Sequence, residues 1–235
     1  MSTGCVKIAL LASVVSDIAS DAVIARWARP DDRAEAARRG NPDAVRRTLL
    51  GRALIRALVS DMTGEDGHKF QIRTEGNGKP FLRLPSGNDG PAISVSHSGA
   101  VVVAAVTRLG ALGIDVEYHR PNRPLESLAA FAFGAQERAA AAQSSGQFYR
   151  IWSLREAMSK ATGNGLREAA DRTDRVPSGP ATGAWTMNDA DGPWLLAHLT
   201  PFADYSFAIA VRPGLNDPVV PWSLAAIDWW RPDGA

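Results

Sequence analysis

The stretch Leu112-Gly113-Ile114-Asp115-Val116-Glu117 is the most informative part of the chain, because an apolar run ends there on two carboxylates. Side chains alternate between the two faces of a strand, so Asp115 and Glu117 share one face while Ile114 and Val116 share the other. Gly113 has no side chain and leaves room for another element to approach closely. Charged groups at the end of a buried strand need a partner. The stretch therefore predicts a buried strand that presents two acids to a partner.

A second motif, Trp152-Ser153-Leu154-Arg155-Glu156-Ala157-Met158-Ser159-Lys160, lies in an amphipathic helix predicted over residues 147–161. Glu156 and Lys160 are four residues apart and share a helix face. Only four of the 26 basic residues are lysines, so an ordinary basic surface position in this chain would be an arginine. A lysine at position 160 therefore indicates that a compact ammonium group is preferred there over a planar guanidinium. Each motif alone is also typical of ordinary surface charges. Together they supply three carboxylate ligands for a hard divalent cation and an ammonium group beside it, a set that suits chemistry on a phosphate ester.

Helices and short strands surround these motifs in an order typical of an α+β fold. Asn41-Pro42-Asp43 is a helix start signal. The expected strands at residues 92–95, 100–107 and 112–117 follow one another across short turns, which suggests an antiparallel meander. We expect helices at residues 21–39, 43–61, 125–133, 135–142 and 147–161, and strands at residues 6–15, 70–73, 80–84, 92–95, 100–107, 112–117, 184–187, 194–200 and 205–211.

Helices followed by strands occur twice along the chain, with a change near residues 120–124. We therefore expect two similar α+β halves with pseudo-two-fold symmetry, each an antiparallel sheet packed with helices. The halves would be residues 1–120 and residues 121–235. The second half would include a tryptophan-containing C-terminal tail that folds back onto the body, and a Gly-, Pro- and Asp-rich loop at residues 167–183.

The composition is that of an ordinary globular protein. The 235 residues are 45% hydrophobic and 22% charged, and the net charge of +1 gives no overall attraction to nucleic acid or membrane. Arginines outnumber acids between residues 26 and 56, which fits either a phosphate- or protein-binding surface or a solvated helix face. The single cysteine, Cys5, excludes an intrachain disulfide and favours a reducing compartment. We expect a cytoplasmic monomer that binds neither nucleic acid nor membrane.

Two further segments could bind phosphate. Ile93-Ser94-Val95-Ser96-His97-Ser98-Gly99 runs from a strand into a tight turn, where hydroxyl, imidazole and amide groups could hold a phosphate or merely form a hairpin. Ser96 and His97 point to opposite sides of the strand, which disfavours a nucleophile–base pair. Gly78-Lys79-Pro80 places a lysine at a hairpin without the frame of a P-loop. One cysteine and four histidines do not make a zinc pattern.

Taken in order, these segments resemble the signature of the Sfp-type 4′-phosphopantetheinyl transferases. The resemblance includes Arg47-Thr48-Leu49-Leu50-Gly51, which is similar to the family's N-terminal helix, and it runs from about residue 30 to residue 165. Alanine after Glu156 places the chain nearer the subgroup named for tryptophan and Lys-Glu-Ala. Each motif is weakly specific alone, whereas their order and spacing are specific together.

The resemblance implies transfer of 4′-phosphopantetheine from coenzyme A to a serine of an acyl or peptidyl carrier protein, with release of 3′,5′-ADP. It implies that Asp115, Glu117 and Glu156 hold Mg²⁺ on the diphosphate of coenzyme A. Glu156, or a water that it orients, would accept the serine proton, and Lys160 would stabilise or protonate the departing phosphate. The residues expected to hold the adenosine 3′-phosphate end are Thr48, Lys79, Ser96 and His97.

The sequence departs from the family pattern in two places. Arg155 stands where lysine is common, and we expect it to contact the diphosphate or the carrier. Asp32 and Glu35 fall where positive charge is expected, so Arg33, Arg38 or Arg39 would substitute. Two alternatives use the same residues: Mg²⁺-dependent hydrolysis of a coenzyme A or nucleotide diphosphate, and a binding protein for coenzyme A or carrier that has lost activity through Arg155.

Overall fold

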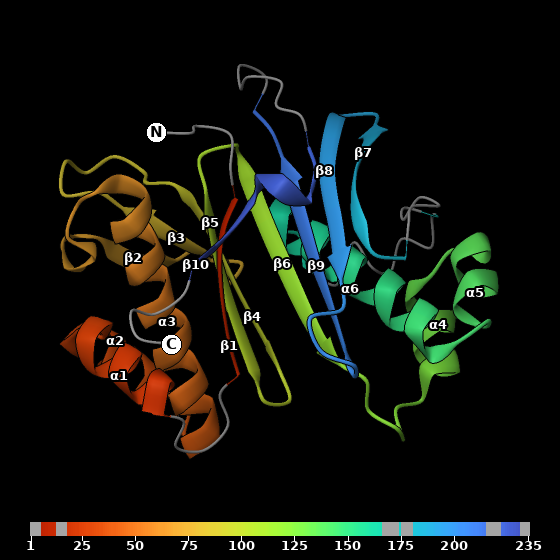
Figure 1. Cartoon of the computed structure of the whole chain (residues 1–235), viewed down its shortest axis with the longest axis horizontal. Helices are drawn as coiled ribbons and strands as arrows, with labels where there is room; N and C mark the ends of the chain where they lie inside the picture. Colours follow the sequence, from red (N-terminus) through yellow and green to blue (C-terminus); the bar gives the residue numbers. More distant parts are fainter. Residues whose placement is uncertain (1–5, 13–17, 166–173, 175–180, 215–221, 231–235) are drawn as a thin grey trace. The chain divides into compact units, whose positions relative to one another are not determined.

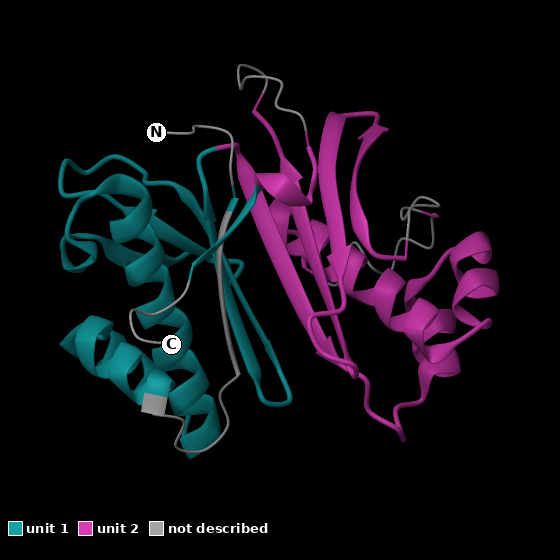
Figure 2. Cartoon of the chain, viewed as in Figure 1, with its two compact units in different colours: residues 1–108, 227–235 teal, residues 109–226 magenta. Residues whose placement is uncertain are grey.

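A computed structural model describes residues 6–12, 18–165, 174, 181–214 and 222–230. The chain forms two compact units, unit 1 of residues 1–108 and 227–235 and unit 2 of residues 109–226 (Figure 2). Their helices and largely antiparallel sheets confirm the α+β class. The bounds of the units differ from the expected halves, because the strand at 111–118 belongs to unit 2 and the last strand belongs to unit 1. The halves 1–120 and 121–235 and their pseudo-two-fold symmetry stay predictions.

Unit 1 contains a four-stranded sheet in the order β10-β1-β5-β4 and a separate hairpin of β2 and β3 (Figure 1). The sheet is antiparallel except for the pairing of β1 with β10. Helix α3 packs on the sheet, and α1 and α2 pack on α3. The elements are β1 (Val6–Ala12), α1 (Ile18–Trp27), α2 (Pro30–Ala37), α3 (Pro42–Thr63), η1 (Gly67–Lys69), β2 (Gln71–Thr74), β3 (Pro80–Arg83), β4 (Ala92–Ser98), β5 (Val101–Thr107) and β10 (Ile227–Trp230).

Helix α3 begins at the predicted start signal and continues two residues beyond the expected end, to Thr63. The Asn41 side chain accepts hydrogen bonds from the backbone N–H groups of Asp43 and Ala44, at 2.9 and 3.2 Å, and Pro42 occupies the first turn. The helix ends at Gly64, whose φ of 73° lies in the left-handed region that favours glycine. The expected helix over residues 21–39 is instead two helices, because Pro30 cannot continue the hydrogen-bonding pattern of α1.

Unit 2 contains an antiparallel sheet in the order β6-β9-β8-β7, and α6 packs on β6 and β9 (Figure 1). The expected meander is wrong at its last strand, because β6 pairs with β9 and not with β5. The two edges of β5 are already paired, one with β4 and the other with β1. The elements are β6 (Ala111–Tyr118), α4 (Leu125–Ala132), α5 (Ala135–Ala141), α6 (Ser145–Thr162), β7 (Gly183–Asp189), β8 (Gly192–Leu199), β9 (Tyr205–Arg212) and η2 (Leu224–Ala226).

A glycine lets α6 lie directly on the backbone of β6. A Cβ atom at Gly113 would lie 1.9 Å from the carbonyl oxygen of Ala157 and 2.5 Å from the backbone nitrogen of Ala161. The close approach expected at Gly113 is therefore confirmed. It brings the residue two positions later on the same strand face, Asp115, next to the last turns of α6.

Part of the C-terminal tail folds back onto unit 1, as expected, because residues 227–230 form β10 beside β1. The Trp222 indole donates a hydrogen bond to the Leu196 carbonyl at 2.7 Å within unit 2. Cys5 and almost all of the expected loop at 167–183 lie outside the described residues. Among the helices that the structure describes, none is long and apolar enough to cross a membrane.

Candidate active site

Asp115 and Lys160 link the strand to the helix in unit 2. The Lys160 Nζ atom donates to Asp115 Oδ1 at 2.7 Å, and Asp115 is only 5% exposed. The two residues are 45 positions apart in the sequence and meet because α6 packs on β6 at Gly113. A buried carboxylate needs such a partner, and a charge-assisted hydrogen bond is a strong one.

Glu117 is held at both of its carboxylate oxygens. The Trp152 indole N–H donates to Oε1 at 2.9 Å, and the Arg123 guanidinium donates to Oε2 at 3.0 Å. Arg123 also lies over two aromatic rings, 4.8 Å from the centroid of Trp152 and 5.5 Å from that of Tyr149. The sequence motif contains Trp152 without indicating its role, and Arg123 lies outside both sequence motifs and was not predicted as a site residue. The only local signal for Arg123 is its place in the proline-flanked segment between β6 and α4.

Glu156 lies close enough to the other two acids to interact with them. Burial raises the pKa of Glu156, the negative charges of Asp115 and Glu117 add to that shift, and the charges of Lys160 and Arg123 oppose it; together they bring the pKa to about 7. A carboxyl group that titrates near neutral pH can both accept and return a proton. The structure thus brings Asp115, Glu117, Glu156 and Lys160 into one electrostatic cluster, as the two sequence motifs predict.

The donor set of this cluster has the chemistry that a hard divalent cation requires. Mg²⁺ prefers oxygen ligands and retains several water molecules, so three neighbouring carboxylates fit it. Among the described residues, however, no group of three or more acid, His or Cys side chains already surrounds a metal position. Asp115 and Glu117 instead contact Lys160 and Arg123. The residues fit a metal by chemistry, and their side chains would have to rearrange to ligate it.

Arg155 has a different partner from the expected ones. Its guanidinium donates to Glu137 Oε2 at 2.8 Å, and the two side chains are 6% and 2% exposed. Glu137 also accepts a hydrogen bond from the backbone N–H of Gly134 at the start of α5. This buried pair connects α5 to α6, so the structure supports a structural role for Arg155. Contact of Arg155 with a diphosphate or a carrier stays a prediction.

A pocket in unit 1, with a volume of about 730 Å³, is lined by Thr48 and His97 and by the two neighbours of Lys79. Burial lowers the pKa of Lys79, and the charge of Glu75 opposes that shift. The Ser96 side chain is buried on the other face of β4, whereas His97 is exposed, as strand alternation predicts. The structure therefore brings Thr48 and His97 together in one pocket, with Lys79 in the adjoining turn and Ser96 outside the lining.

The same pocket is strongly basic. Glu35, the single acid among the described residues of its lining, pairs with Arg38 at 3.0 Å. The Nε atom of Arg47 is buried and has no hydrogen-bond partner among the described residues. Such a lining suits an anion that offers several acceptor oxygens. The arginines of the lining are Arg38, Arg39, Arg47, Arg52 and Arg73.

Asp32 has a structural role that explains the acid at this unexpected position. Its carboxylate accepts hydrogen bonds from Arg52 Nε at 2.6 Å, from Arg56 Nε at 2.7 Å and from the Arg29 backbone N–H at 3.0 Å. Burial would raise the pKa of Asp32, but these hydrogen bonds and the charge of Arg56 hold the pKa below its ordinary value. Asp32 thereby orients Arg52, which lines the basic pocket.

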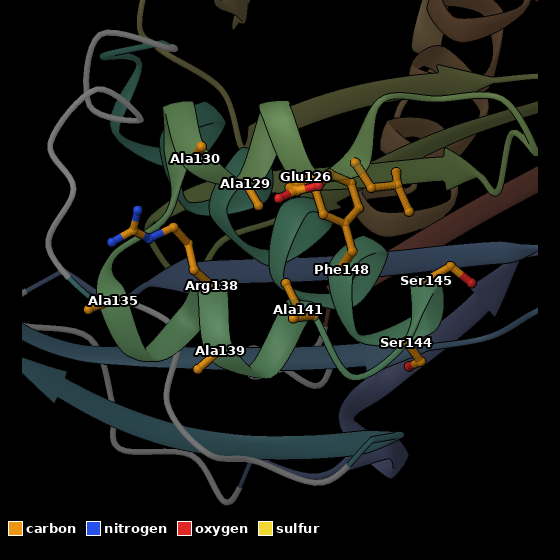
Figure 3. A pocket seen from close by; sticks show the side chains of 12 residues that line it. Glu126, Ala129, Ala130, Ala135, Arg138, Ala139, Ala141, Ser144, Ser145 and Phe148 are labelled. Atoms are coloured by element: carbon orange, nitrogen blue, oxygen red, sulfur yellow. The ribbon is translucent and has the colours of Figure 1, made fainter.

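A second cavity, of about 690 Å³, lies between α4, α5 and the start of α6 (Figure 3). Its walls are mainly alanine side chains, with Glu126 and Arg138 among the few charged residues. None of the site residues predicted from the sequence belongs to its described lining. The candidate active site is therefore the carboxylate cluster on β6 and α6, with the basic pocket of unit 1 as a separate anion site.

Comparisons with known proteins agree with this chemistry. Residues 111–210 match the 4′-phosphopantetheinyl transferase superfamily, and residues 21–108 match the N-terminal part of 4′-phosphopantetheinyl transferases. The chain is 31% identical over 187 residues to the 4′-phosphopantetheinyl transferase HetI of Nostoc sp., with 77% of each chain covered. It is 30% identical over 174 residues to psf-1 of Bacillus pumilus, covering 72% of each, and 30% identical over 142 residues to Sfp of Bacillus subtilis, covering 58% of this chain and 61% of Sfp. The chain belongs to the 4′-phosphopantetheinyl transferase family of the Sfp type, and it is an enzyme of that class.

Proposed function

We propose that the protein transfers 4′-phosphopantetheine from coenzyme A to a serine of an acyl or peptidyl carrier protein, with release of 3′,5′-ADP. In this reaction the serine oxygen forms a bond to the phosphorus that carries the pantetheine arm. The bond from that phosphorus to the oxygen of 3′,5′-ADP breaks. The observation that carries the proposal is the cluster of Asp115, Glu117, Glu156 and Lys160, in which the pKa of Glu156 is raised to about 7.

Glu156 is the proposed base, acting directly or through an oriented water. An ordinary glutamate is a weak base at neutral pH, because its pKa lies near 4.3. In the absence of a metal ion, burial and the neighbouring acids raise the pKa of Glu156 to about 7, so its carboxylate is a better proton acceptor than that of an ordinary glutamate. The proton of the carrier serine would pass to this carboxylate as the new phosphate ester forms.

Lys160 is the proposed partner of the leaving group. Its ammonium lies 2.7 Å from Asp115 and belongs to the last turn of α6. A compact ammonium group can donate a hydrogen bond to the oxygen on which charge develops as the bond to 3′,5′-ADP breaks, and it can supply a proton there. The Lys160 side chain is 33% exposed, which is compatible with contact to a substrate.

Asp115, Glu117 and Glu156 would hold Mg²⁺ in this proposal. The metal would supply Lewis-acid stabilisation of the charge on the diphosphate. Three neighbouring oxygen donors support this assignment, and the residues contribute no sulfur or imidazole that would favour another metal. The cations that now pair with Asp115 and Glu117 would exchange partners when the metal is bound.

The basic pocket of unit 1 is the proposed site of the adenosine 3′-phosphate. Thr48 and His97 line it, and the buried Nε atom of Arg47 has no partner among the described side chains. Arginines in this pocket would supply the positive charge expected at the position of Asp32 and Glu35. Lys79 and Ser96, which do not line the pocket, remain proposed contacts to the same end of coenzyme A.

The test is to incubate the protein with coenzyme A, Mg²⁺ and an apo carrier protein and to weigh the carrier. A gain by the mass of one phosphopantetheine arm, lost when the carrier serine is replaced by alanine, supports the proposal. Coenzyme A cleaved without any gain would favour the hydrolase alternative. Bound coenzyme A with neither cleavage nor transfer would favour the inactive binding protein.

The assignment of the unit 1 pocket has its own test. Removing the 3′-phosphate from the substrate should raise KM in the wild type, and Arg47→Gln should abolish this difference between coenzyme A and dephospho-coenzyme A. Arg138→Gln is a matched control, because Arg138 is an exposed arginine of unit 2 that does not line the basic pocket. If Arg47→Gln discriminates the two substrates as well as the wild type does, Arg47 does not bind the 3′-phosphate.

A further inference from the structure

Two of the three acids of the candidate metal site already have a cationic partner within the protein. Lys160 pairs with Asp115 at 2.7 Å, and Arg123 pairs with Glu117 at 3.0 Å. Setting these two cations against Asp115, Glu117 and Glu156 leaves at most a single negative charge in the cluster. Both members of the Arg123–Glu117 pair are largely shielded from water, with side chains 18% and 16% exposed.

The two resident cations affect the binding of a divalent metal ion to the carboxylate cluster. A bare metal ion would add two positive charges next to two resident cations, and such repulsion is only partly screened in a shielded site. A metal ion accompanied by a diphosphate brings its own negative charge and avoids that cost. The charges of the cluster therefore favour joint binding of metal and diphosphate over binding of the metal alone.

Arg123 is better placed to release the Glu117 carboxylate than Lys160 is to release Asp115. Its guanidinium lies over the rings of Trp152 and Tyr149, so it keeps favourable cation–π contacts when it leaves the carboxylate. It belongs to the segment between β6 and α4, outside regular secondary structure. Trp152, by contrast, is a neutral donor to the other oxygen of Glu117 and can keep orienting Glu117 without repelling a metal.

We propose that Arg123 is a positioning residue that makes metal binding at Glu117 conditional on the diphosphate. Without substrate, Arg123 occupies Glu117 Oε2 and disfavours the metal ion. When metal and diphosphate arrive together, Arg123 releases Oε2 and stays over the aromatic rings. The inference rests on the proposed function, because it takes Asp115, Glu117 and Glu156 as the metal ligands.

The experiment measures Mn²⁺ binding by electron paramagnetic resonance, with and without coenzyme A and in the absence of carrier. The proteins are the wild type, Arg123→Gln, Arg123→Lys and the exposed control Arg138→Gln. We expect coenzyme A to tighten Mn²⁺ binding to the wild type at least about tenfold. Arg123→Gln should bind Mn²⁺ alone about tenfold more tightly than the wild type, and its enhancement by coenzyme A should shrink by the same factor. Arg123→Lys and Arg138→Gln should resemble the wild type.

Mn²⁺ binding to Arg123→Gln that is equal to or weaker than that of the wild type, without coenzyme A, would overturn the inference. A merely structural role predicts the weaker binding, because loss of the Arg123 contacts would loosen Glu117. Asp115→Asn separates this failure from failure of the proposed function. If the wild type shows coenzyme A-dependent Mn²⁺ binding and Asp115→Asn does not, the proposed metal site is supported independently of the role of Arg123. If no protein binds Mn²⁺ even with coenzyme A, the metal site and this inference fail together.

Discussion

Replacing Gly113 by alanine should separate the two elements that carry the candidate active site. The added Cβ atom would lie 1.9 Å from the Ala157 carbonyl oxygen and 2.5 Å from the Ala161 nitrogen, and Cβ atoms essentially never come closer than 3.0 Å to a non-bonded heavy atom of a distant residue. Both neighbours are backbone atoms of α6, so no side chain can rotate to make room. The helix backbone must therefore move away from β6 by about 1 Å.

The cost of this movement follows from what α6 contacts. Overpacking in a dense core typically costs about 1–3 kcal/mol, and we expect a value near the upper end because the obstacle is main chain. The 2.7 Å contact between Asp115 and Lys160 would lengthen beyond hydrogen-bonding range. A displacement of about 1 Å at a catalytic group can lower activity about 100-fold.

Urea denaturation would measure the loss of stability, and carrier modification followed by mass spectrometry would measure the loss of activity. Gly146→Ala is a matched control in the first turn of α6, where the nearest atom to an added Cβ is 3.8 Å away. This control should gain about 0.5–1 kcal/mol, because alanine is the better helix residue. A free energy of unfolding for Gly113→Ala within about 0.5 kcal/mol of the wild-type value would show that the added Cβ atom does not clash with the backbone of α6.

Three further predictions concern buried or shifted groups. Asp32→Asn should lower the free energy of unfolding by about 3–5 kcal/mol, because Arg52 and Arg56 lose their buried counterion, and urea denaturation would show it. In the wild type the lowered pKa of Asp32 also stabilises the fold at pH values above about 3.9, and this pH-dependent stabilisation is lost as the pH falls through the lowered pKa. Burial lowers the pKa of His198 to about 4, helped by the charges of Arg150 and His119 and opposed by the hydrogen bond to the Ala181 carbonyl. An unfolded histidine has a pKa near 6.5, so the unfolded state binds the proton at a higher pH than the folded state does. The free energy of unfolding should therefore fall as the pH drops below about 6.5, by about 2 kcal/mol at pH 5. If His198→Gln shows the same fall in the free energy of unfolding between about pH 6.5 and pH 5, His198 is not its cause. Glu156→Gln should abolish transfer to the carrier while coenzyme A still binds, as measured by calorimetry, and an unchanged rate would exclude Glu156 as the base.

Local patterns in the sequence predicted most elements of the fold. The Asn41 cap and the four-residue spacing of Leu50, Leu54 and Leu58 predicted α3, since both signals act within one helix. The expected helices and strands of unit 2 agree with the structure to within a few residues. Strand partners were harder to predict. The pairing of β6 with β9 depends on which strand edges remain free after β1 has taken the edge of β5, and no window of sequence contains that information.

For the candidate site, too, the residues were predictable from the sequence and their contacts were not. The residues that could act were predictable from local sequence, because the alternation of β6 and the turn of α6 place Asp115, Glu117, Glu156 and Lys160 on defined faces. Their partners were not predictable in this way, because they follow from the packing of the folded chain. Trp152 reaches Glu117 across 35 residues, and Arg155 is buried against Glu137 on another helix. Periodicity fixes the direction of a side chain within its own element, whereas an ion pair or hydrogen bond depends on distances that exist only after the elements pack.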